Sequence, residues 1–386
     1  MITNMKSVCL LLLSAVLLVV SFTSPAIAAT PSWITSQRSV TKIADGVYVI
    51  IHKDAIEDSW PQGNTTVIIG DREVFVVDAC FLPSSAKEDI ADIRKLTSKP
   101  VRYLLNTHFH IDHNAGNSAY MDAFPGLIII AQDNTRRLMN NANSAFAANV
   151  AAAEGRPTTV ILPTLRKELE TGKGEDGQPL TPEGKARVDR QIAQVQNEIT
   201  EYRTFKFQGP TLTFSSEMTV DLGNREIQIK HLGRGNTPGD ALVYLPQDKI
   251  LVTGDLLVWP IPYMRMSYPH EWVEVLRKMT AMNAATIVPG HGMILRDAAY
   301  LNQVIALLES VIQQVHEQAP KIGFDSRNKV PKVEDLHVDV EQFRKNMTGD
   351  DPINVEFWQD IVDPGMIGGV NQGVVGRTYA EEMGRL

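Results

Sequence analysis

The chain has 386 residues, of which 44% are hydrophobic and 21% charged. This balance excludes a disordered or fibrous protein and suits one large globular domain or two moderate ones. The formal net charge at pH 7 is −8, and an acidic surface argues against nucleic acid as the main partner.

The N-terminus has the pattern of an export signal. Lys6 precedes an apolar run over residues 8–20, and Ala26-Ile27-Ala28 has the small-residue spacing of a cleavage site. We therefore expect residues 1–28 to be a signal peptide and the protein to be secreted or periplasmic, without stable membrane insertion after cleavage. An uncleaved membrane anchor is the alternative, which the short apolar run disfavours.

Cleavage after residue 28 also removes Lys6 and Cys9, so the formal charge becomes −9 and Cys80 is the only cysteine left. No intramolecular disulfide can then form. Cys80 lies two residues after Asp78, close to the expected site. Its simplest interpretation is a small buried hydrophobic side chain.

The first half of the fold is predicted to begin near Thr41 and to alternate strands with helices. Strands are expected at residues 46–51, 65–70, 73–78, 101–106 and 128–130, and helices at 84–96, with a serine cap, and at 118–124. This order favours a layered α/β sandwich.

Three histidines and an aspartate follow the strand at 101–106, in the sequence Thr-His-Phe-His-Ile-Asp-His-Asn; they are His108, His110, Asp112 and His113. These residue types hold Zn²⁺ in catalytic sites, and four in six positions are hard to explain as a solvated loop. Because alternate residues of an extended chain point the same way, His108, His110 and Asp112 are expected to converge, while His113 leaves on the other side.

Residues 133–210 interrupt the alternation with a predicted helical insertion. Helices are expected at 133–153 and from 182 onward, the second with one apolar stripe made of Val188, Ile192, Val195, Ile199 and Tyr202. A lid, a dimer arm and a partner surface are the functional alternatives. The simpler one is that the stripe packs onto its own domain.

The second half returns to strands, expected at residues 218–222, 225–232, 241–245, 250–253 and 286–288, with helices at 272–283 and 298–318. Residues from about 319 onward are polar and glycine-rich. The expected organisation is a domain over 41–300 that contains the 133–210 insertion, followed by a helical or irregular C-terminal extension over 301–386.

Four further motifs accompany the histidine cluster, and they end or follow predicted strands: Val76-Val77-Asp78, Gly235-Asn236-Thr237-Pro238-Gly239-Asp240, Thr253-Gly254-Asp255 and Val288-Pro289-Gly290-His291-Gly292. In this order the five motifs resemble the metallo-β-lactamase superfamily of hydrolases over about residues 45–295. The resemblance implies a four-layer αββα sandwich with metals at the strand ends.

The resemblance also implies a two-ion site with Zn²⁺ or another divalent metal, one or two ions per chain. In it, His108 and His110 would bind the first ion. The second ion would be bound by Asp112, His113 and His291. Asp255 would bridge both ions, and Asp78 would orient the ligand loop without binding metal. Asp112 and Asp255 would be the catalytic carboxylates. They would orient a metal-activated hydroxide and accept its proton.

One ligand departs from the family pattern. The third motif is usually Gly-x-Gly-His-Thr, and here Asn236 stands at the histidine position. Three outcomes are open: Asn236 coordinates weakly, the first site stays empty, or His231 reaches in from the preceding strand. His231 has a simpler role as a strand-end histidine bonded to backbone. Arg234 is expected to hold either a substrate carboxylate or a backbone carbonyl.

Substrate evidence comes from residues 259–266, which follow Asp255 with aromatic and apolar side chains and one arginine. They suit an apolar ester, lactone, thioester or lactam with a nearby anionic group, or they pack the loop. The aspartate at position 255 resembles the broader, glyoxalase II-like hydrolases rather than true β-lactamases, which usually carry cysteine or serine. We therefore expect an exported hydrolase acting on a small molecule. The alternatives are a metallo-β-lactamase proper and a non-catalytic binding protein with a degenerate first metal site.

Overall fold

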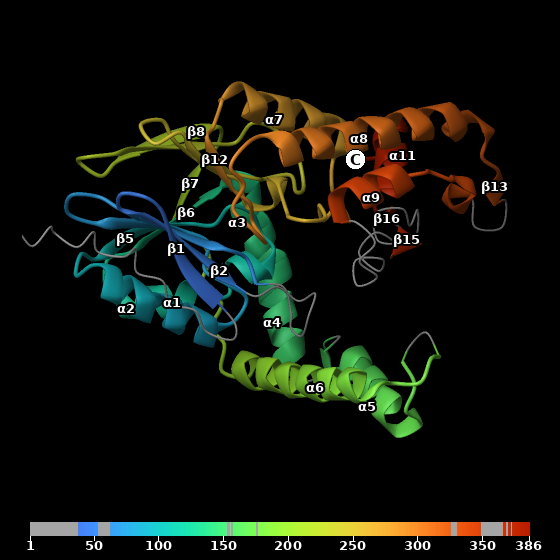
Figure 1. The fold of residues 1–386 in the computed structure, drawn as a ribbon, viewed down its shortest axis with the longest axis horizontal. Coiled ribbons are helices and arrows are strands. Elements are labelled where there is room, and N and C mark those ends of the chain that lie inside the picture. Colours follow the sequence, from blue (N-terminus) through green and yellow to red (C-terminus); the bar gives the residue numbers. More distant parts are fainter. Residues whose placement is uncertain are drawn as a thin grey trace, which may run out of the picture.

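The computed structural model describes residues 38–52, 62–152, 155, 157–174, 177–325, 330–348, 366–367, 370–371 and 373–386. The expected signal peptide lies outside the described residues. Two β-sheets pack face to face and carry helices on their outer sides (Figure 1). Within the described part of the chain, no helix is both long and apolar enough to cross a membrane.

The first sheet has seven strands in chain order: β1 (Arg38–Ala44), β2 (Val47–His52), β3 (Thr65–Ile69), β4 (Val74–Val77), β5 (Val101–Leu105), β6 (Ile128–Gln132) and β7 (Leu212–Phe214). Strands β1 to β4 are antiparallel neighbours, whereas β4, β5, β6 and β7 run parallel. The carboxyl ends of these parallel strands therefore lie at one edge, where ligand-binding loops gather in α/β folds.

The second sheet has the order β12-β11-β10-β9-β8, with bounds β8 (Glu217–Asp221), β9 (Glu226–Lys230), β10 (Leu242–Leu245), β11 (Ile250–Val252) and β12 (Thr286–Val288). Only β11 and β12 are parallel neighbours in it. The loops that follow these two strands contain Asp255 and His291, so the sheet delivers both side chains to the same edge.

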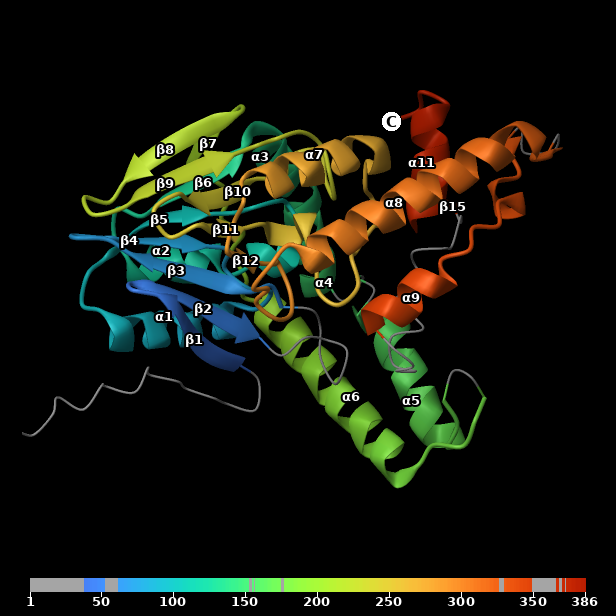
Figure 2. The same ribbon diagram turned by 45° about the horizontal axis from the view of Figure 1, so that its top comes forward.

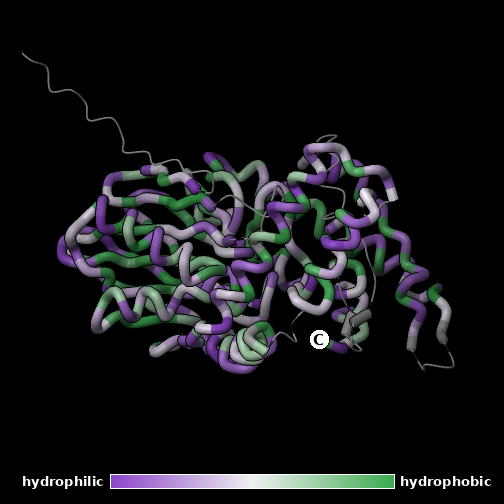
Figure 3. Tube along the Cα trace, turned by 90° about the horizontal axis from the view of Figure 1, so that it is seen from below, coloured by the Kyte–Doolittle hydropathy of each residue, from purple (hydrophilic) through white to green (hydrophobic). Residues whose placement is uncertain are grey.

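Four layers result, as the sequence predicts. Val49, Phe75 and Val77 of the first sheet bury against Ile229 and Val243 of the second. The outer face of the first sheet is covered by α1 (Pro83–Leu96) and α2 (Asn117–Ala123), and that of the second by α7 (Pro269–Ala281) and α8 (Ala299–Gln318). Figure 2 shows these helix layers on opposite sides. Figure 3 shows hydrophobic residues along the interior strands and hydrophilic loops at the rim. The αββα fold class is therefore confirmed.

The segment between β6 and β7 is helical. It contains α3 (Asp133–Leu138), a π-helical turn (Met139–Asn143), α4 (Ser144–Ala151), a second π-helical turn (Pro157–Ile161), α5 (Leu162–Thr171) and α6 (Pro182–Tyr202). The predicted stripe of α6 is buried against α4 and α5 and against Phe81 and Ala115 of the sandwich. The C-terminal end of α6 therefore contacts the sandwich, while the rest of the arm made by α5 and α6 projects from it (Figure 2).

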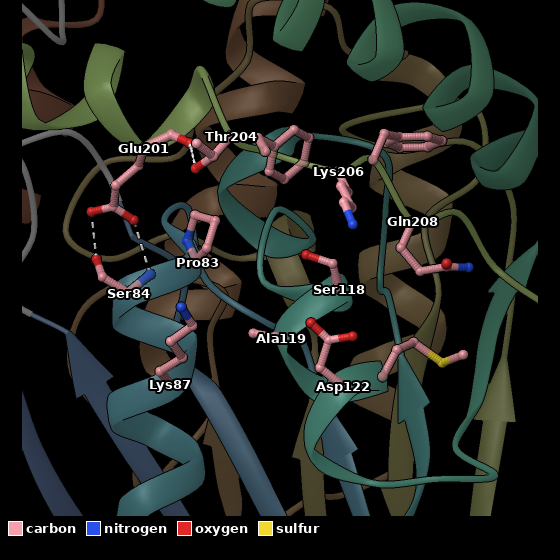
Figure 4. Close-up of a pocket in the computed structure, with 13 residues that line it drawn as sticks. Pro83, Ser84, Lys87, Ser118, Ala119, Asp122, Glu201, Thr204, Lys206 and Gln208 are labelled. Carbon is pink, nitrogen blue, oxygen red and sulfur yellow. Dashed lines mark hydrogen bonds between the residues drawn. The ribbon is translucent and has the colours of Figure 1, made fainter.

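The start of α1 differs from the sequence prediction. The helix begins at Pro83, whose fixed φ angle suits a first helical position, and the preceding residue gives no side-chain cap. Ser84 is not the cap. Instead its backbone N–H and its hydroxyl donate to the Glu201 carboxylate of α6, at 3.0 and 2.7 Å (Figure 4). A distant residue has taken over the capping role.

The C-terminal part covers the outer helices of the second sheet. It contains α9 (Glu341–Thr348), α11 (Gly373–Glu382) and two short hairpins, β13 (Phe324–Asp325) with β14 (Val330–Pro331) and β15 (Met366–Ile367) with β16 (Val370–Asn371). Val374, Val375 and Tyr379 of α11 belong to the same buried cluster as α7 and α8. The last described helix is therefore part of the core.

Candidate metal centre

Four loops that follow parallel strands build the site. Asp78 follows β4, the histidine cluster follows β5, Asp255 follows β11 and His291 follows β12. Because each sheet sends its parallel strand ends to the same edge, residues far apart in the chain meet between the two sheets. The described residues contain two groups of potential metal ligands there, and both include Asp255.

The larger group consists of Asp112, His113, Asp255 and His291. The His113 Nε2 atom lies 3.1 Å from His291 Nε2 and 3.2 Å from Asp255 Oδ1. The His291 Nε2 atom is also 3.0 Å from Asp112 Oδ2. Two imidazole nitrogens and two carboxylate oxygens therefore point at a common centre, which is the arrangement of a cation's ligands.

The smaller group consists of His108, His110 and Asp255. The His108 Nε2 atom lies 2.9 Å from His110 Nδ1 and 3.5 Å from Asp255 Oδ2. Asp255 thus offers Oδ1 to one group and Oδ2 to the other, as a carboxylate that bridges two ions would do.

The expectation that His108, His110 and Asp112 converge while His113 points away is wrong. Residues Ile111–His113 form a 3-10 turn, so the alternation of an extended strand stops after His110. The turn brings Asp112 and His113 to the same side, where they join His291. Asp112 and His113 therefore belong to the same donor group, as the family resemblance implies and as the alternation of an extended strand does not.

Asp78 holds the ligand loop from behind. Its carboxylate accepts hydrogen bonds from the backbone N–H and the hydroxyl of Thr107, both at 2.8 Å. Its Oδ2 atom also lies 2.8 Å from His113 Nδ1. A proton on Nδ1 leaves Nε2 free as a ligand atom, which is the usual function of a carboxylate behind a metal-binding histidine.

The third-motif loop presents Asn236 as a buried amide. Asp240 fixes this loop by accepting bonds from the Thr237 backbone and hydroxyl, at 2.8 and 2.6 Å, and from the Gly235 N–H at 3.1 Å. The Asn236 side chain is 0% exposed, and within the described residues neither its nitrogen nor its oxygen has a hydrogen-bond partner. Such an unpaired buried amide is costly unless a ligand satisfies it.

His231 and Arg234 lie outside both donor groups. The His231 Nδ1 atom bonds to the backbone oxygen of Asp240 at 2.7 Å, which is the simpler of the two roles expected for it. Arg234 pairs with Glu271, with Nε 3.0 Å from Oε1, and stacks over the Tyr268 ring at 4.1 Å. In this conformation both support the third-motif loop from behind.

Electrostatics prepares the two groups for a cation. Burial lowers the pKa of His110 to about 3, so its imidazole is neutral and can act as a ligand. Burial opposes the charge on Asp112 and Asp255, but the neighbouring His113 and His291 outweigh it and lower the pKa of both carboxyl groups. The pKa of His113 is raised, because the carboxylates around it outweigh its burial. A divalent cation would replace such a proton.

The residues present fit one or two divalent ions. Asp255 Oδ1 and both polar atoms of the Asn236 amide are buried atoms without hydrogen-bond partners in the described chain. Gly63 and Gly290 leave the space that the site needs, because a Cβ at either would overlap His113 or Asp255. Imidazole and carboxylate donors in this mixture suit Zn²⁺ and related metals.

The structure adds residues beside the site that the sequence motifs did not single out. The Asn64 backbone donates to the Gly290 oxygen at 2.6 Å, and its side chain donates to the Pro289 oxygen at 3.0 Å. Two aromatic rings lie beside His110, with centroid distances of 4.7 Å for Phe109 and 5.7 Å for Tyr263. No motif pointed to Asn64 or Phe109.

The predicted substrate segment over residues 259–266 divides between two roles. Ile261 and Met264 are buried in the core around α7 and α8, so they pack the loop. Tyr263 instead faces His110. A separate cavity of about 500 Å³ lies between α1, α2 and the chain after α6, and Lys87, Asp122 and Lys206 line it (Figure 4). None of the predicted site residues lines this cavity.

A family model and several known proteins are similar to this chain. The family model described as the metallo-beta-lactamase superfamily matches residues 58–291. Among curated proteins, the chain is 23% identical over 252 residues to a linear primary-alkylsulfatase from a Pseudomonas species, covering 64% of this chain and 44% of that protein. It is 24% identical over 326 residues to the alkyl/aryl-sulfatase BDS1 of Saccharomyces cerevisiae, covering 79% and 46%. The chain thus spans about half the length of the curated relatives it matches.

Solved structures with a similar fold include a metallo-beta-lactamase from Pontibacter korlensis, with 18% identity, a TM-score of 0.49 and coverage of 71% of this chain and 99% of that one. The DIM-1 metallo-beta-lactamase exposed to ceftazidime has 17% identity, a TM-score of 0.48 and coverage of 71% and 97%.

Proposed function

The chain belongs to the metallo-β-lactamase superfamily, and from that premise we propose that it is a metal-dependent hydrolase that cleaves an ester-type bond in a small molecule. The observation that carries the proposal is Asp255, whose two oxygens each face one of two groups of buried donors. A scaffold without chemistry has no need for this concentration of ionisable groups.

The residues divide the work as follows. One ion would be held by His108, His110 and the Asn236 amide. The other would be held by Asp112, His113 and His291, and Asp255 would contact both ions. A divalent ion bound there lowers the pKa of a water to about 7 and polarises the oxygen of the reacting bond. Asp112, with its side chain 14% exposed, is the more accessible of the two carboxylates and is placed to orient a water and take its proton. Asp78 keeps His113 in the tautomer that binds metal.

We propose a sulfate ester with an alkyl or aryl leaving group as the first substrate class to test. Both curated relatives reported above are named as sulfatases. The Phe109 and Tyr263 rings beside His110 offer apolar surface to such a leaving group. Hydrolysis would add water to the ester and release an alcohol and hydrogen sulfate. Carboxylic esters, lactones, thioesters and lactams are the other classes that this site accommodates.

The test is a substrate panel with the full chain: p-nitrophenyl sulfate, dodecyl sulfate, p-nitrophenyl butyrate, a γ-lactone, an acyl thioester and a chromogenic cephalosporin. We expect activity that depends on added divalent metal and that Asp255→Asn lowers by at least about a hundredfold, because both donor groups lose a ligand. Asp221→Asn, on an exposed strand position, is the matched control. If the chain binds metal but turns over no substrate of the panel, the hydrolase proposal is replaced by that of a binding protein.

We also propose that the protein is exported, from the signal-like pattern in residues 1–28. N-terminal sequencing of protein recovered outside the cytoplasm tests this. A chain that starts at Ala29 is expected, whereas full-length protein retained in the cytoplasm contradicts it.

A further inference from the structure

A second cluster of metal-binding residue types lies away from the two donor groups that meet at Asp255. It consists of His52 at the end of β2, Cys80 in the loop after β4 and Asp89 on α1. The three side chains are 4%, 0% and 0% exposed. Elements that are separate in the chain therefore bring an imidazole, a thiol and a carboxylate together in the interior.

The three donor atoms form a closed triangle. Cys80 Sγ lies 2.9 Å from Asp89 Oδ2 and 3.3 Å from His52 Nε2, and His52 Nε2 lies 3.1 Å from Asp89 Oδ2. The same mutual approach of imidazole and carboxylate atoms marks the larger donor group of the main site. The triangle repeats that pattern with a sulfur in place of one nitrogen.

Hydrogen bonds alone leave this cluster incompletely satisfied. If the thiol and the imidazole both donate to Asp89 Oδ2, no proton lies between sulfur and nitrogen, although they are 3.3 Å apart. Asp89 Oδ1 is buried and has no partner in the described chain, and neither does the nearby Tyr120 hydroxyl. Leaving buried polar atoms unpaired costs stability, so a bound ligand is favoured.

A divalent ion fits the charges and the donor types. A thiolate and a carboxylate together carry the charge that cancels a divalent cation, which is what a fully buried site requires. Sulfur and imidazole favour Zn²⁺ over oxygen-loving metals. Tetrahedral Zn²⁺ sets such donors roughly 3.3–3.6 Å apart, so the edge from Cys80 Sγ to Asp89 Oδ2, at 2.9 Å, would have to open by about 0.6 Å and the other two by less. The Thr65 hydroxyl lies 3.5 Å from Cys80 Sγ.

We propose that His52, Cys80 and Asp89 form an additional, structural Zn²⁺ site, separate from the catalytic donor groups. The ion would fasten β2, α1 and the loop after β4. That loop contains Asp78 and Cys80, both in the left-handed region with φ of 63° and 62°. Between them, the Ala79 N–H donates to the His113 oxygen at 2.8 Å. The site would therefore stabilise the backbone that supports His113.

Cobalt substitution tests the proposal, because a thiolate bound to Co²⁺ gives a near-ultraviolet charge-transfer band that imidazole and carboxylate ligands do not give. The only thiols in the chain are Cys9 and Cys80. We expect the band in the Co²⁺-loaded full chain and in Cys9→Ser, and its absence in Cys80→Ser. Mass spectrometry should also find one Zn²⁺ ion fewer per chain in Cys80→Ser than in Cys9→Ser.

Two results would overturn the site: no thiolate band in the Co²⁺-saturated Cys9→Ser chain, or a band that persists in Cys80→Ser. If Cys9→Ser shows no thiolate band, His52, Cys80 and Asp89 are only a hydrogen-bonded cluster, and any band in the full chain comes from Cys9. This result needs no Cys80 variant, so it decides the question even if Cys80→Ser fails to fold. Neither readout uses a substrate, and the main donor groups contain no sulfur, so failure of the hydrolase proposal stays distinguishable.

Discussion

The Asn236 amide is the residue on which metal occupancy depends most directly. Its nitrogen and oxygen are both buried without partners in the described chain, a state that costs on the order of 1–3 kcal/mol per group. An amide oxygen is a neutral and weaker ligand than an imidazole. The His108–His110 side is therefore expected to hold its ion less tightly than the Asp112–His113–His291 side.

Replacing Asn236 by histidine should tighten binding of the first ion by roughly tenfold or more, because imidazole is the better ligand for zinc. Metal content after dialysis against a competing chelator measures this. Asn224→His, at an exposed turn, should leave both affinities unchanged. Equal metal retention in Asn236→His and the native chain would mean that the amide does not face the ion.

Glu198 of α6 gives the insertion a dependence on pH. The side chain is 0% exposed, its two oxygens lack partners in the described chain, and burial raises its pKa from 4.5 to about 8. Between these values the unfolded chain loses the proton while the folded chain keeps it. The contribution of Glu198 to the free energy of unfolding therefore falls as pH rises from about 4.5 to about 8, and it stays low above that.

Glu198→Gln should remove this loss, since glutamine does not titrate. The variant should gain stability over the native chain as pH rises through that window, by up to a few kcal/mol at pH 8. Chemical denaturation at several pH values measures the difference. Glu170→Gln, exposed on α5, is the control and should show none. A constant difference between pH 5 and pH 8 would argue against a neutral Glu198.

Among the elements, α6 is held near its C-terminal end by polar contacts and by one apolar face. The Tyr202 hydroxyl donates to the Phe81 oxygen at 3.1 Å. Glu201 accepts two hydrogen bonds from Ser84 at the start of α1, where the positive end of the helix dipole also favours a carboxylate. Val195, Ile199 and Tyr202 bury against the sandwich and α4. The arm is therefore anchored at the end nearest the sheets.

Glu201→Ala should weaken this anchor by about 1–2 kcal/mol, the usual range for losing a helix cap. Hydrogen exchange of the last turns of α6 and the first turn of α1 should speed up together. Asp189→Ala, exposed on the same helix, should change neither segment. Faster exchange in α6 alone would show that the cap does not connect the two helices.

The elements that the sequence predicted well are those with their own hydrophobic signal. Strands such as β3 and β4 are short apolar runs that are buried almost throughout, and the stripe on α6 matches its buried face. The edge strand β1 was not predicted, because most of its residues are half-buried. The three-residue β7 was missed because it is too short to show a period. The helix α5 was missed although Leu162, Leu165 and Leu169 repeat at helical spacing and pack together.

Predictability at the site follows the same rule. The predicted ligands lie in short motifs, so their residue types could be read from the sequence. The local backbone conformation, which decides where each side chain points, could not. The 3-10 turn at Ile111–His113 brings Asp112 and His113 to the same side, whereas the alternation of an extended strand predicted opposite sides. His52, Cys80 and Asp89 were not connected, because 37 residues separate the first from the last and only the pairing of β2 with its neighbours brings them together.

At the scale of the whole molecule, the C-terminal helix α11 completes the apolar layer outside the second sheet. Val374, Val375 and Tyr379 are buried there, and the Arg377 Nε donates to the Ser267 oxygen at 2.7 Å. Arg377 also stacks over Tyr268, whose N–H donates to the Gly235 oxygen at 2.8 Å. The end of the chain thus supports the loop that presents Asn236.

Removing residues 373–386 should lower the free energy of unfolding by more than about 4 kcal/mol, because burying each large apolar side chain is worth about 1.5–3 kcal/mol. Thermal unfolding and soluble yield report the loss. Removing only residues 383–386, where Met383 and Leu386 are 46% and 37% exposed, should have little effect. Equal stability of the two truncated chains would contradict a core role for α11.

The pairing of β6 with β7 has a consequence for how this protein can diversify. These strands are parallel neighbours, and the whole helical arm leaves from one and returns to the other. The first turns of this helical segment also hold the site loops, because the Thr135 hydroxyl donates to the Gly239 oxygen and the Asn143 side chain donates to the Phe109 oxygen, both at 2.7 Å. A shorter crossover could therefore replace only the arm made by α5 and α6, and it would have to cover Phe81 and Ala115 again.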